Sequence, residues 1–139
     1  MIKLVILLKK RADLTTEQFR HHYETSHAYH AMRHFGHLWV EYRRNYPVSS
    51  SSFAAADEGA DVDPSEDGVP AFDAVTEIVL RDQAAFDEFL RLLAVPETRR
   101  FFSEDEARFT DRKRSRFMVC DVVQSQAWIQ WPPTPASVC

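Results

Sequence analysis

The stretch IKLVILLKKRADLTTEQF, residues 2–19, determines how the fold begins. Its first seven residues are mainly branched aliphatics and a charged run follows them, which is typical of a short buried strand. The stretch then ends in a helix signal. Thr15 or Thr16 can cap a helix, and an acid and an amide, Glu17 and Gln18, follow within the first turn.

The helix that starts there should run to about Phe35, because Gly36 favours a C-terminal stop. The other predicted elements are strands over 37–48, 71–82 and 114–124, a helix over 82–94, and a short helical stretch over 96–102 that leads into a charged loop. In the second strand, Leu38, Val40 and Tyr42 alternate with Trp39, Glu41 and Arg43, so the two sets should face opposite sides of the sheet.

The predicted order β-α-β-β-α-β is that of the ferredoxin-like α+β fold. We therefore expect a four-stranded antiparallel sheet with both helices on one face. The opposite face should carry apolar side chains such as Trp39, Val75 and Val79. Because such residues are costly in water, the pattern favours a homodimer in which two sheets pack back to back.

A single domain over residues 1–125 is expected, interrupted at 49–70 by a serine-rich and then acidic segment without periodicity. We interpret that segment as a long flexible loop, since each flank is too small to fold alone. Residues 126–139 form a tail rich in proline and tryptophan, which should wrap over a surface or a partner subunit.

The composition limits the class of protein. A formal net charge of −4 does not favour nucleic acid, and no apolar run approaches the ~18 residues that cross a membrane. The first residues resemble no signal peptide. Cys120 and Cys139 are too few for a disulfide framework or a zinc signature. We expect a cytoplasmic protein with neither nucleic acid nor membrane as a partner.

All six histidines of the chain lie within residues 21–37. At about 100° per residue, His27, His30 and His34 share one helical stripe with Phe19 and Tyr23. This stripe should pack against the sheet, and the other three histidines should lie at the surface.

Three interpretations of the stripe remain open. The histidines can belong to a slightly polar packing face, or they can bind a metal ion or a haem, although three ligands on one helix converge poorly on one tetrahedral ion. They can also carry out acid–base chemistry, because an imidazole titrates near pH 6.5. Hydrogen-bonding partners for such a histidine would be Tyr23, Tyr42, and either Asp73 or Glu77.

Several motifs in the same order resemble the EthD family. The opening strand is followed by Leu14, Thr15, Glu17 and Phe19, and then by Tyr23 and His27 four residues apart. EYRRNY, with Tyr42 and Asn45, is similar to the family's second strand, and FDAVTEIVLRDQAAFDEFL to its strand with Asp73 and Glu77. ARFTDRKRSRFMVCDVV is similar to its closing segment.

This resemblance implies a dimeric α/β barrel with a pocket between sheet and helices. It also implies a cofactor-independent lyase or cyclase that decarboxylates or dehydrates an aromatic polyketide-type molecule, with no metal. His27 would be the general acid–base, and Tyr42 or Tyr23 would stabilise an enolate oxygen. The expected substrate-binding residues are Phe19, His30, Leu38, Val40, Asp73, Glu77 and Phe86. A haem- or metal-binding protein and a non-catalytic binding protein are the alternatives.

Overall fold

The computed structural model describes residues 1–57, 59 and 68–125. Its centre is a four-stranded sheet of β1 (Ile2–Leu8), β2 (Trp39–Asn45), β3 (Ala74–Leu80) and β4 (Arg116–Cys120). The strands lie in the order β2-β3-β1-β4, and every neighbouring pair is antiparallel. The predicted ferredoxin-like α+β fold is therefore confirmed.

The first helical segment runs without a break from Thr16 to Phe35. It consists of α1 (Thr16–His22), a π-helical stretch η1 (Tyr23–His27) and α2 (Ala28–Phe35), and a 3-10 turn η2 (Gly36–Leu38) follows. Thr15 caps it as predicted: its Oγ1 accepts from the Gln18 backbone at 3.1 Å, while its own N–H donates to Gln18 Oε1 at 2.9 Å. The π-helical stretch was not predicted.

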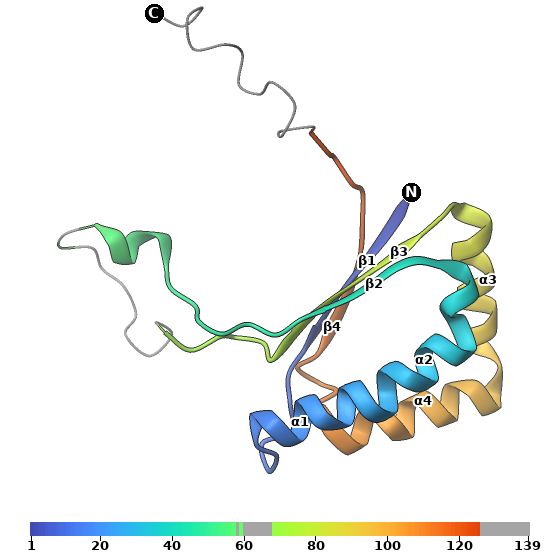
Figure 1. Cartoon of the computed structure of the whole chain (residues 1–139), viewed down its shortest axis with the longest axis horizontal. Helices are drawn as coiled ribbons and strands as arrows, with labels where there is room; N and C mark the ends of the chain where they lie inside the picture. The colour runs from blue at the N-terminus through green and yellow to red at the C-terminus, as the bar shows by residue number, and fades with distance from the viewer. Residues whose placement is uncertain (58, 60–67, 126–139) are drawn as a thin grey trace, which may run out of the picture.

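The second helical segment is longer than expected. It comprises α3 (Gln83–Ala94), whose cap Asp82 accepts from the Ala85 N–H at 2.9 Å, and α4 (Pro96–Phe109). The prediction of a charged loop after residue 102 was wrong. Phe102, Asp105 and Phe109 form a buried stripe inside α4 at helical spacing. Helices α1 to α4 lie on one side of the sheet (Figure 1).

A β-bulge in β2 changes which side chains face the helices. Trp39 pairs with Leu80 and Glu41 with Val79, so Val40 is the extra residue. Trp39 and Tyr42 consequently lie on the same, helix-covered face, and Val40 is 62% exposed. The expected alternation, which put Trp39 on the opposite face, is corrected at this point.

The core fills the space between the sheet and the helices as two clusters. One gathers around Leu4, Phe35, Ile78 and Phe89 near α2 and α3. The other lies near α1 and the end of α4 and contains Leu8, Phe19, Tyr23, Ala28, Ala74 and Phe109. The face of the sheet away from the helices carries Val75 and Val79, as predicted, beside an ion pair between Lys3 and Glu77.

The connection between β2 and β3 projects beyond the end of the sheet (Figure 1). Its described part contains a short 3-10 turn, η3 (Phe53–Ala56), and a hydrogen bond from the Gly68 N–H to the Ser50 carbonyl at 2.7 Å. The centre of the predicted acidic loop and the predicted tail over 126–139 lie outside the described residues. Within the described ranges, no helix is both long and apolar enough to cross a membrane.

Candidate functional site

The π-helical stretch determines where the histidines lie. The buried residues of the first helical segment are Phe19, Tyr23, Ala28, Ala31 and Phe35, with a step of five residues after Tyr23. The extra residue in η1 shifts the inward stripe by one position. Ala31 and Phe35 therefore occupy the sheet-facing positions that were expected for His30 and His34.

His27 makes a hydrogen bond to a buried carboxylate on α4. Its Nδ1 lies 2.9 Å from Oδ2 of Asp105, and Nε2 of His22 lies 3.0 Å from the other carboxylate oxygen. Because an ionised carboxylate only accepts, both imidazoles donate to it. His27 therefore carries its proton on Nδ1 in the neutral state, which leaves Nε2 as its acceptor nitrogen.

The environment of Asp105 keeps it ionised. The residue is 2% exposed, and burial by itself would raise its pKa. The hydrogen bonds from His27 and His22, and the charges of these histidines, outweigh burial and hold the pKa of Asp105 well below its usual range. Ser26 Oγ also donates to this carboxylate at 3.1 Å.

Aromatic rings fix the orientation of both imidazoles. Phe109, which is fully buried, stacks on the His22 ring at 4.8 Å and packs against the His27 ring at 5.1 Å between centroids. Phe102 meets the His27 ring in a T-shaped arrangement, with centroids 5.7 Å apart. Since Phe102, Asp105 and Phe109 come from one face of α4, this helix supplies both the carboxylate and the rings that hold the histidines.

The sheet and the helices enclose a cavity of about 700 Å³ that His27 lines. Most of the wall is apolar. Its side chains come from the strands, the first helical segment, α3 and α4, and include Leu4, Ile6, Phe35, Ile78 and Phe89. The polar groups within this wall include the side chains of Tyr23 and Tyr42 beside His27. A largely apolar cavity with a few polar groups is the usual form of a small-molecule site.

The two tyrosines form a short chain of hydroxyls that leads into the cavity. The Tyr23 hydroxyl bonds Thr76 Oγ1 at 2.6 Å, and the Tyr42 hydroxyl donates to that of Tyr23 at 3.5 Å. Burial raises the pKa of both phenols. Both therefore stay protonated at neutral pH. Because the contact from the Tyr42 hydroxyl to the Tyr23 hydroxyl is long, Tyr42 can donate to a ligand oxygen instead.

Trp39 contributes its indole ring to the cavity wall. Its indole Nε1 is buried and has no hydrogen-bond partner among the described residues. The ring packs on Tyr42 with centroids 4.8 Å apart. A buried N–H without a partner is unfavourable for the folded state.

Of the residues that the sequence puts forward, Tyr23, His27, Tyr42 and Phe86 line the cavity. The other six lie elsewhere. Phe19 and Leu38 are buried in the core clusters, His30 packs on Phe101 at 4.8 Å, Val40 is in the bulge, Asp73 accepts from the Lys10 N–H at 2.8 Å, and Glu77 pairs with Lys3. None of these six residues lines the 700 Å³ cavity.

The site also contains residues that were not predicted. Asp105 was missed because it lay in a segment taken for a charged loop, although its spacing from Phe102 and Phe109 is helical. His22 was placed at the surface, but its side chain is only 26% exposed. An acid at helical spacing between two aromatics was the signal that could have identified Asp105.

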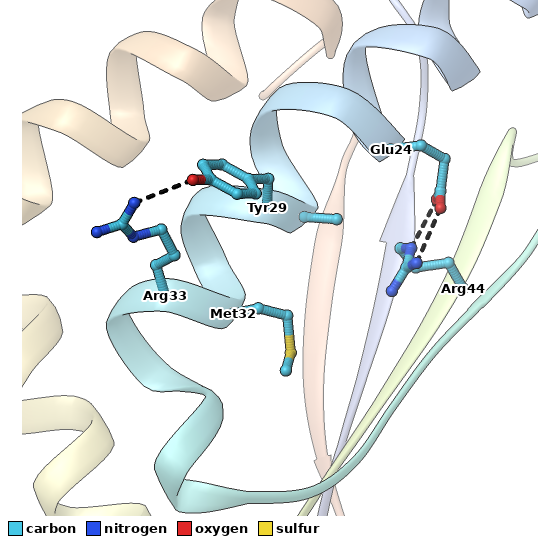
Figure 2. Close-up of a pocket in the computed structure, with 6 residues that line it drawn as sticks. Glu24, Tyr29, Met32, Arg33 and Arg44 are labelled. Carbon is cyan, nitrogen blue, oxygen red and sulfur yellow. Dashed lines mark hydrogen bonds and ion pairs between the residues drawn. The ribbon is translucent and has the colours of Figure 1, made fainter.

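A second, open hollow lies on the other side of the first helical segment. It has a volume of about 420 Å³ and lies between η1–α2 and strand β2. Figure 2 shows Glu24 and Arg44 pointing toward each other and joined as a bidentate ion pair, with Tyr29 and Arg33 bonded to each other further along α2. Glu24 and Arg44 satisfy each other and Arg33 bonds the Tyr29 hydroxyl, so this hollow offers less to a ligand than the cavity does.

The metal interpretation gains no support in the described ranges. They contain no group of three or more His, Cys, Asp or Glu side chains placed to hold an ion. Nδ1 of His34 is bonded to the His30 carbonyl at 2.9 Å, within its own helix. His30 and His34 therefore do not converge with His27 on one ion.

The fold and the site together define a class of protein: a ferredoxin-like α+β chain with an apolar cavity between sheet and helices that can accommodate a small molecule. A scan of family models matches the EthD domain over residues 11–113. The chain belongs to the EthD family, as the motifs predicted.

Solved structures agree with this assignment at the level of the fold. An EthD family protein from Bacillus halodurans superposes with a TM-score of 0.58 at 19% identity, covering 88% of this chain and 99% of that one. A protein from Arabidopsis thaliana gives 0.54 at 11% identity, covering 91% and 99%. A search of the curated proteins finds no match.

Proposed function

We propose that this protein is a cofactor-independent acid–base enzyme, a lyase or cyclase that decarboxylates or dehydrates an aromatic polyketide-type molecule. The observation that carries the proposal is the His27–Asp105 hydrogen bond at the wall of a 700 Å³ apolar cavity. A histidine held by a buried carboxylate is a common arrangement for a general base, because the carboxylate fixes the tautomer and stabilises the imidazolium.

For dehydration or ring closure, Nε2 of His27 takes a proton from a carbon next to a carbonyl. The electron pair moves toward the carbonyl oxygen, where the Tyr42 O–H supplies a donor. In dehydration the C–O bond then breaks, and the imidazolium returns the proton to the leaving hydroxide as water. Asp105 stabilises the imidazolium between these steps.

For decarboxylation, the bond from the ring carbon to the carboxylate breaks and CO₂ leaves. The electron pair stays on the carbon skeleton, where a conjugated oxygen near Tyr42 accepts the charge. Protonated His27 then delivers its proton to the carbon. The apolar wall favours this step, because it removes water from the carboxylate. The localised charge of that group passes to the larger conjugated system as CO₂ departs.

The test is turnover by the protein and by two single variants. Hydroxylated naphthoic acids and bicyclic β-hydroxy ketones are incubated with each, and loss of CO₂ or water is followed by mass spectrometry. His27→Ala should lower turnover by about 10²–10⁴ while the fold is retained. His21→Ala is the matched control, because His21 is exposed and does not line the cavity. Equal turnover by the parent and His27→Ala would refute the proposal, and binding without conversion by the parent would favour the non-catalytic alternative.

We also propose that the chain forms a homodimer through the face of the sheet opposite the helices. Val5, Leu7 and Val75 lie on that face, and Met118, 42% exposed, pairs with Val5. A second copy would bury this apolar strip. Sedimentation equilibrium should give the mass of two chains for the parent and of one chain for Leu7→Glu.

A further inference from the structure

The orientation of the Tyr42 phenol depends on more than its own hydrogen bond. Its hydroxyl lies 3.5 Å from that of Tyr23, and a hydrogen bond of this length is weak. A group that donates to a ligand oxygen must nonetheless be held in position, because a displacement of about 1 Å can cost much of its effect. The contacts of the ring are therefore the ones that can fix it.

The guanidinium of Arg44 provides one of these contacts. Arg44 follows Tyr42 by two positions on β2, so both side chains lie on the helix-covered face of the sheet. Its central carbon lies 4.6 Å from the centroid of the Tyr42 ring, which is within the range of a cation–π interaction. The Trp39 ring, 4.8 Å away between centroids, packs on the same phenol. Tyr42 is thus held by neighbours on its own strand.

Glu24 fixes the guanidinium in turn. Its two carboxylate oxygens accept from Nε of Arg44 at 2.6 Å and from Nη2 at 2.8 Å. Two parallel hydrogen bonds determine both the position and the plane of a guanidinium. The same bonds raise the pKa of Arg44 and lower that of Glu24, so both groups stay charged at neutral pH. Glu24 also accepts from the Tyr46 hydroxyl, which adds a further point of attachment.

The ion pair links β2 to the helical stretch that carries His27. Glu24 follows Tyr23 in η1, and Tyr23 is buried whereas Glu24 lines the outer hollow (Figure 2). The side chains of Glu24 and Arg44 are 37% and 23% exposed, so salt screens their attraction less than that of a fully exposed pair. The same π-helical stretch therefore presents His27 to the cavity and, through Arg44, fixes Tyr42.

We infer that the Glu24–Arg44 ion pair positions Tyr42, so that its hydroxyl donates to a carbonyl or phenolic oxygen of a ligand in the cavity. This inference rests on the proposed function, because it concerns the donor that stabilises the enolate there. Glu24 and Arg44 line the outer hollow and not the cavity, so they are positioning residues. The charge of Arg44 also favours the partial negative charge on the phenol oxygen as the phenol shares its proton with an enolate.

Two probes of nearly one shape measure the hydrogen bond without any turnover. We would titrate the full chain with 2-acetylnaphthalene and with 2-ethylnaphthalene, which lacks the carbonyl oxygen, and follow binding by fluorescence. The parent should bind the ketone about fivefold more tightly, as expected of one hydrogen bond in an apolar cavity. Tyr42→Phe should abolish this preference, and Arg44→Gln or Glu24→Gln should reduce it to about twofold.

Double variants assign the effect of Arg44 to Tyr42. If Arg44 acts through the phenol, Arg44→Gln should not change the preference further in the Tyr42→Phe background. In turnover, Arg44→Gln alone should lower kcat about tenfold with little change in KM, and it should have no further effect in that background. Arg44→Lys retains the charge but neither the paired hydrogen bonds nor the flat stacking, so it should recover only part of the loss. It replaces Arg44→Gln in both tests if that variant does not fold.

Arg43→Gln is the matched control. Arg43 is the adjacent arginine on β2 and also pairs with a glutamate, Glu41, but it is exposed and its side chain faces away from the helices. This variant should leave the preference for the ketone unchanged.

NMR of protein labelled with carbon-13 at tyrosine Cζ reports on Tyr42 directly. Its signal, assigned by its loss in Tyr42→Phe, should move in Arg44→Gln and stay in place in Arg43→Gln. A Tyr42 signal unaffected by Arg44→Gln, or a ketone preference that Arg44→Gln or Glu24→Gln retains in full, would overturn the inference. Failure of both probes to bind would overturn the proposed binding of aromatic molecules, and the tyrosine spectrum would then decide the positioning by itself. Lack of turnover in the parent would refute only the proposed chemistry.

Discussion

His27 and Asp105 form a hydrogen bond of 2.9 Å although 78 positions separate them in the chain. The pairing depends on α4 running antiparallel beside the first helical segment, with Phe102 and Phe109 on either side of the carboxylate. A carboxylate in this position determines which imidazole nitrogen carries the proton.

Asp105→Asn should therefore change which ring nitrogen carries the proton in His27 or in His22. The asparagine amide has one acceptor oxygen and one donor nitrogen, so it cannot accept from His27 and His22 in the present geometry. We expect turnover to fall by about 10²–10⁴ with the helices intact. Nitrogen NMR of the imidazoles would show a changed tautomer at one histidine. Glu104→Gln, at an exposed neighbouring position on α4, should leave both the spectrum and turnover unchanged.

The stability of the protein should fall in acid for the same reason. The pKa of Asp105 is lowered in the folded state relative to an ordinary aspartate near 3.9. The folded state thus binds its proton less readily than the unfolded state does. Its contribution is fully present above about pH 4 and is lost as the pH falls through the folded-state pKa.

Urea unfolding of the parent and of Asp105→Asn from pH 7 down to pH 3 measures this contribution. The variant should be about 1–3 kcal/mol less stable near neutrality, because it loses hydrogen bonds to a charged group. The difference should shrink toward the acid end. A difference that stays constant with pH would show that the carboxylate's charge is not what stabilises the fold.

Substitution of Tyr23 should mainly affect stability, and substitution of Tyr42 should mainly affect activity. Tyr23 is 2% exposed, and its hydroxyl satisfies Thr76, which is fully buried. Tyr23→Phe should cost about 1–3 kcal/mol in the free energy of unfolding, because it leaves the threonine hydroxyl unpaired. Tyr42→Phe removes only a 3.5 Å contact, so it should change the melting temperature less and turnover more.

His22 should act as a positioning residue. It bonds Asp105 and stacks on Phe109, but it does not line the cavity. His22→Phe keeps the stacking and removes the hydrogen bond, so kcat should fall about tenfold with little change in KM. His22→Gln retains a donor and should recover part of the loss. An equal rise of KM in both variants would indicate damage to the cavity instead.

Much of the fold could be predicted because local signals agree with it. The strand at Ile2–Leu8, the Thr15 cap and the start of α3 after Asp82 each follow from the residues at those positions. Tyr23, His27 and Tyr42, which the sequence put forward for the site, line the cavity, and their catalytic roles stay a prediction. The family motifs around these residues agreed.

The remainder could not be predicted because it depends on irregular backbone. The bulge at Val40 brings Trp39 to the helix-covered face and leaves Val40 exposed, and η1 moves the histidines after Tyr23 by one position. Neither irregularity has a glycine or proline to mark it in the sequence. A regular period of 2 or 3.6 residues therefore assigned these side chains to the wrong face.

Deletion of one residue from η1 tests whether this irregularity serves the site. Thr25 is exposed, and its side chain bonds only the His21 carbonyl at 2.7 Å. Without it, Ala28 would follow Tyr23 at four positions, as a regular α-helix requires. The buried stripe could then pack as before, so helical content and melting temperature should change little. The angular position of His27 between α1 and α2 would change, however, and even about 1 Å of displacement can cost 10²-fold in rate.

Thr25→Ala is the matched control, since it removes the same hydroxyl and keeps the chain length. We expect turnover to fall about a hundredfold in the deletion variant and to be retained in Thr25→Ala. Full activity after the deletion would mean that the π-helical stretch has no part in presenting His27 to the cavity.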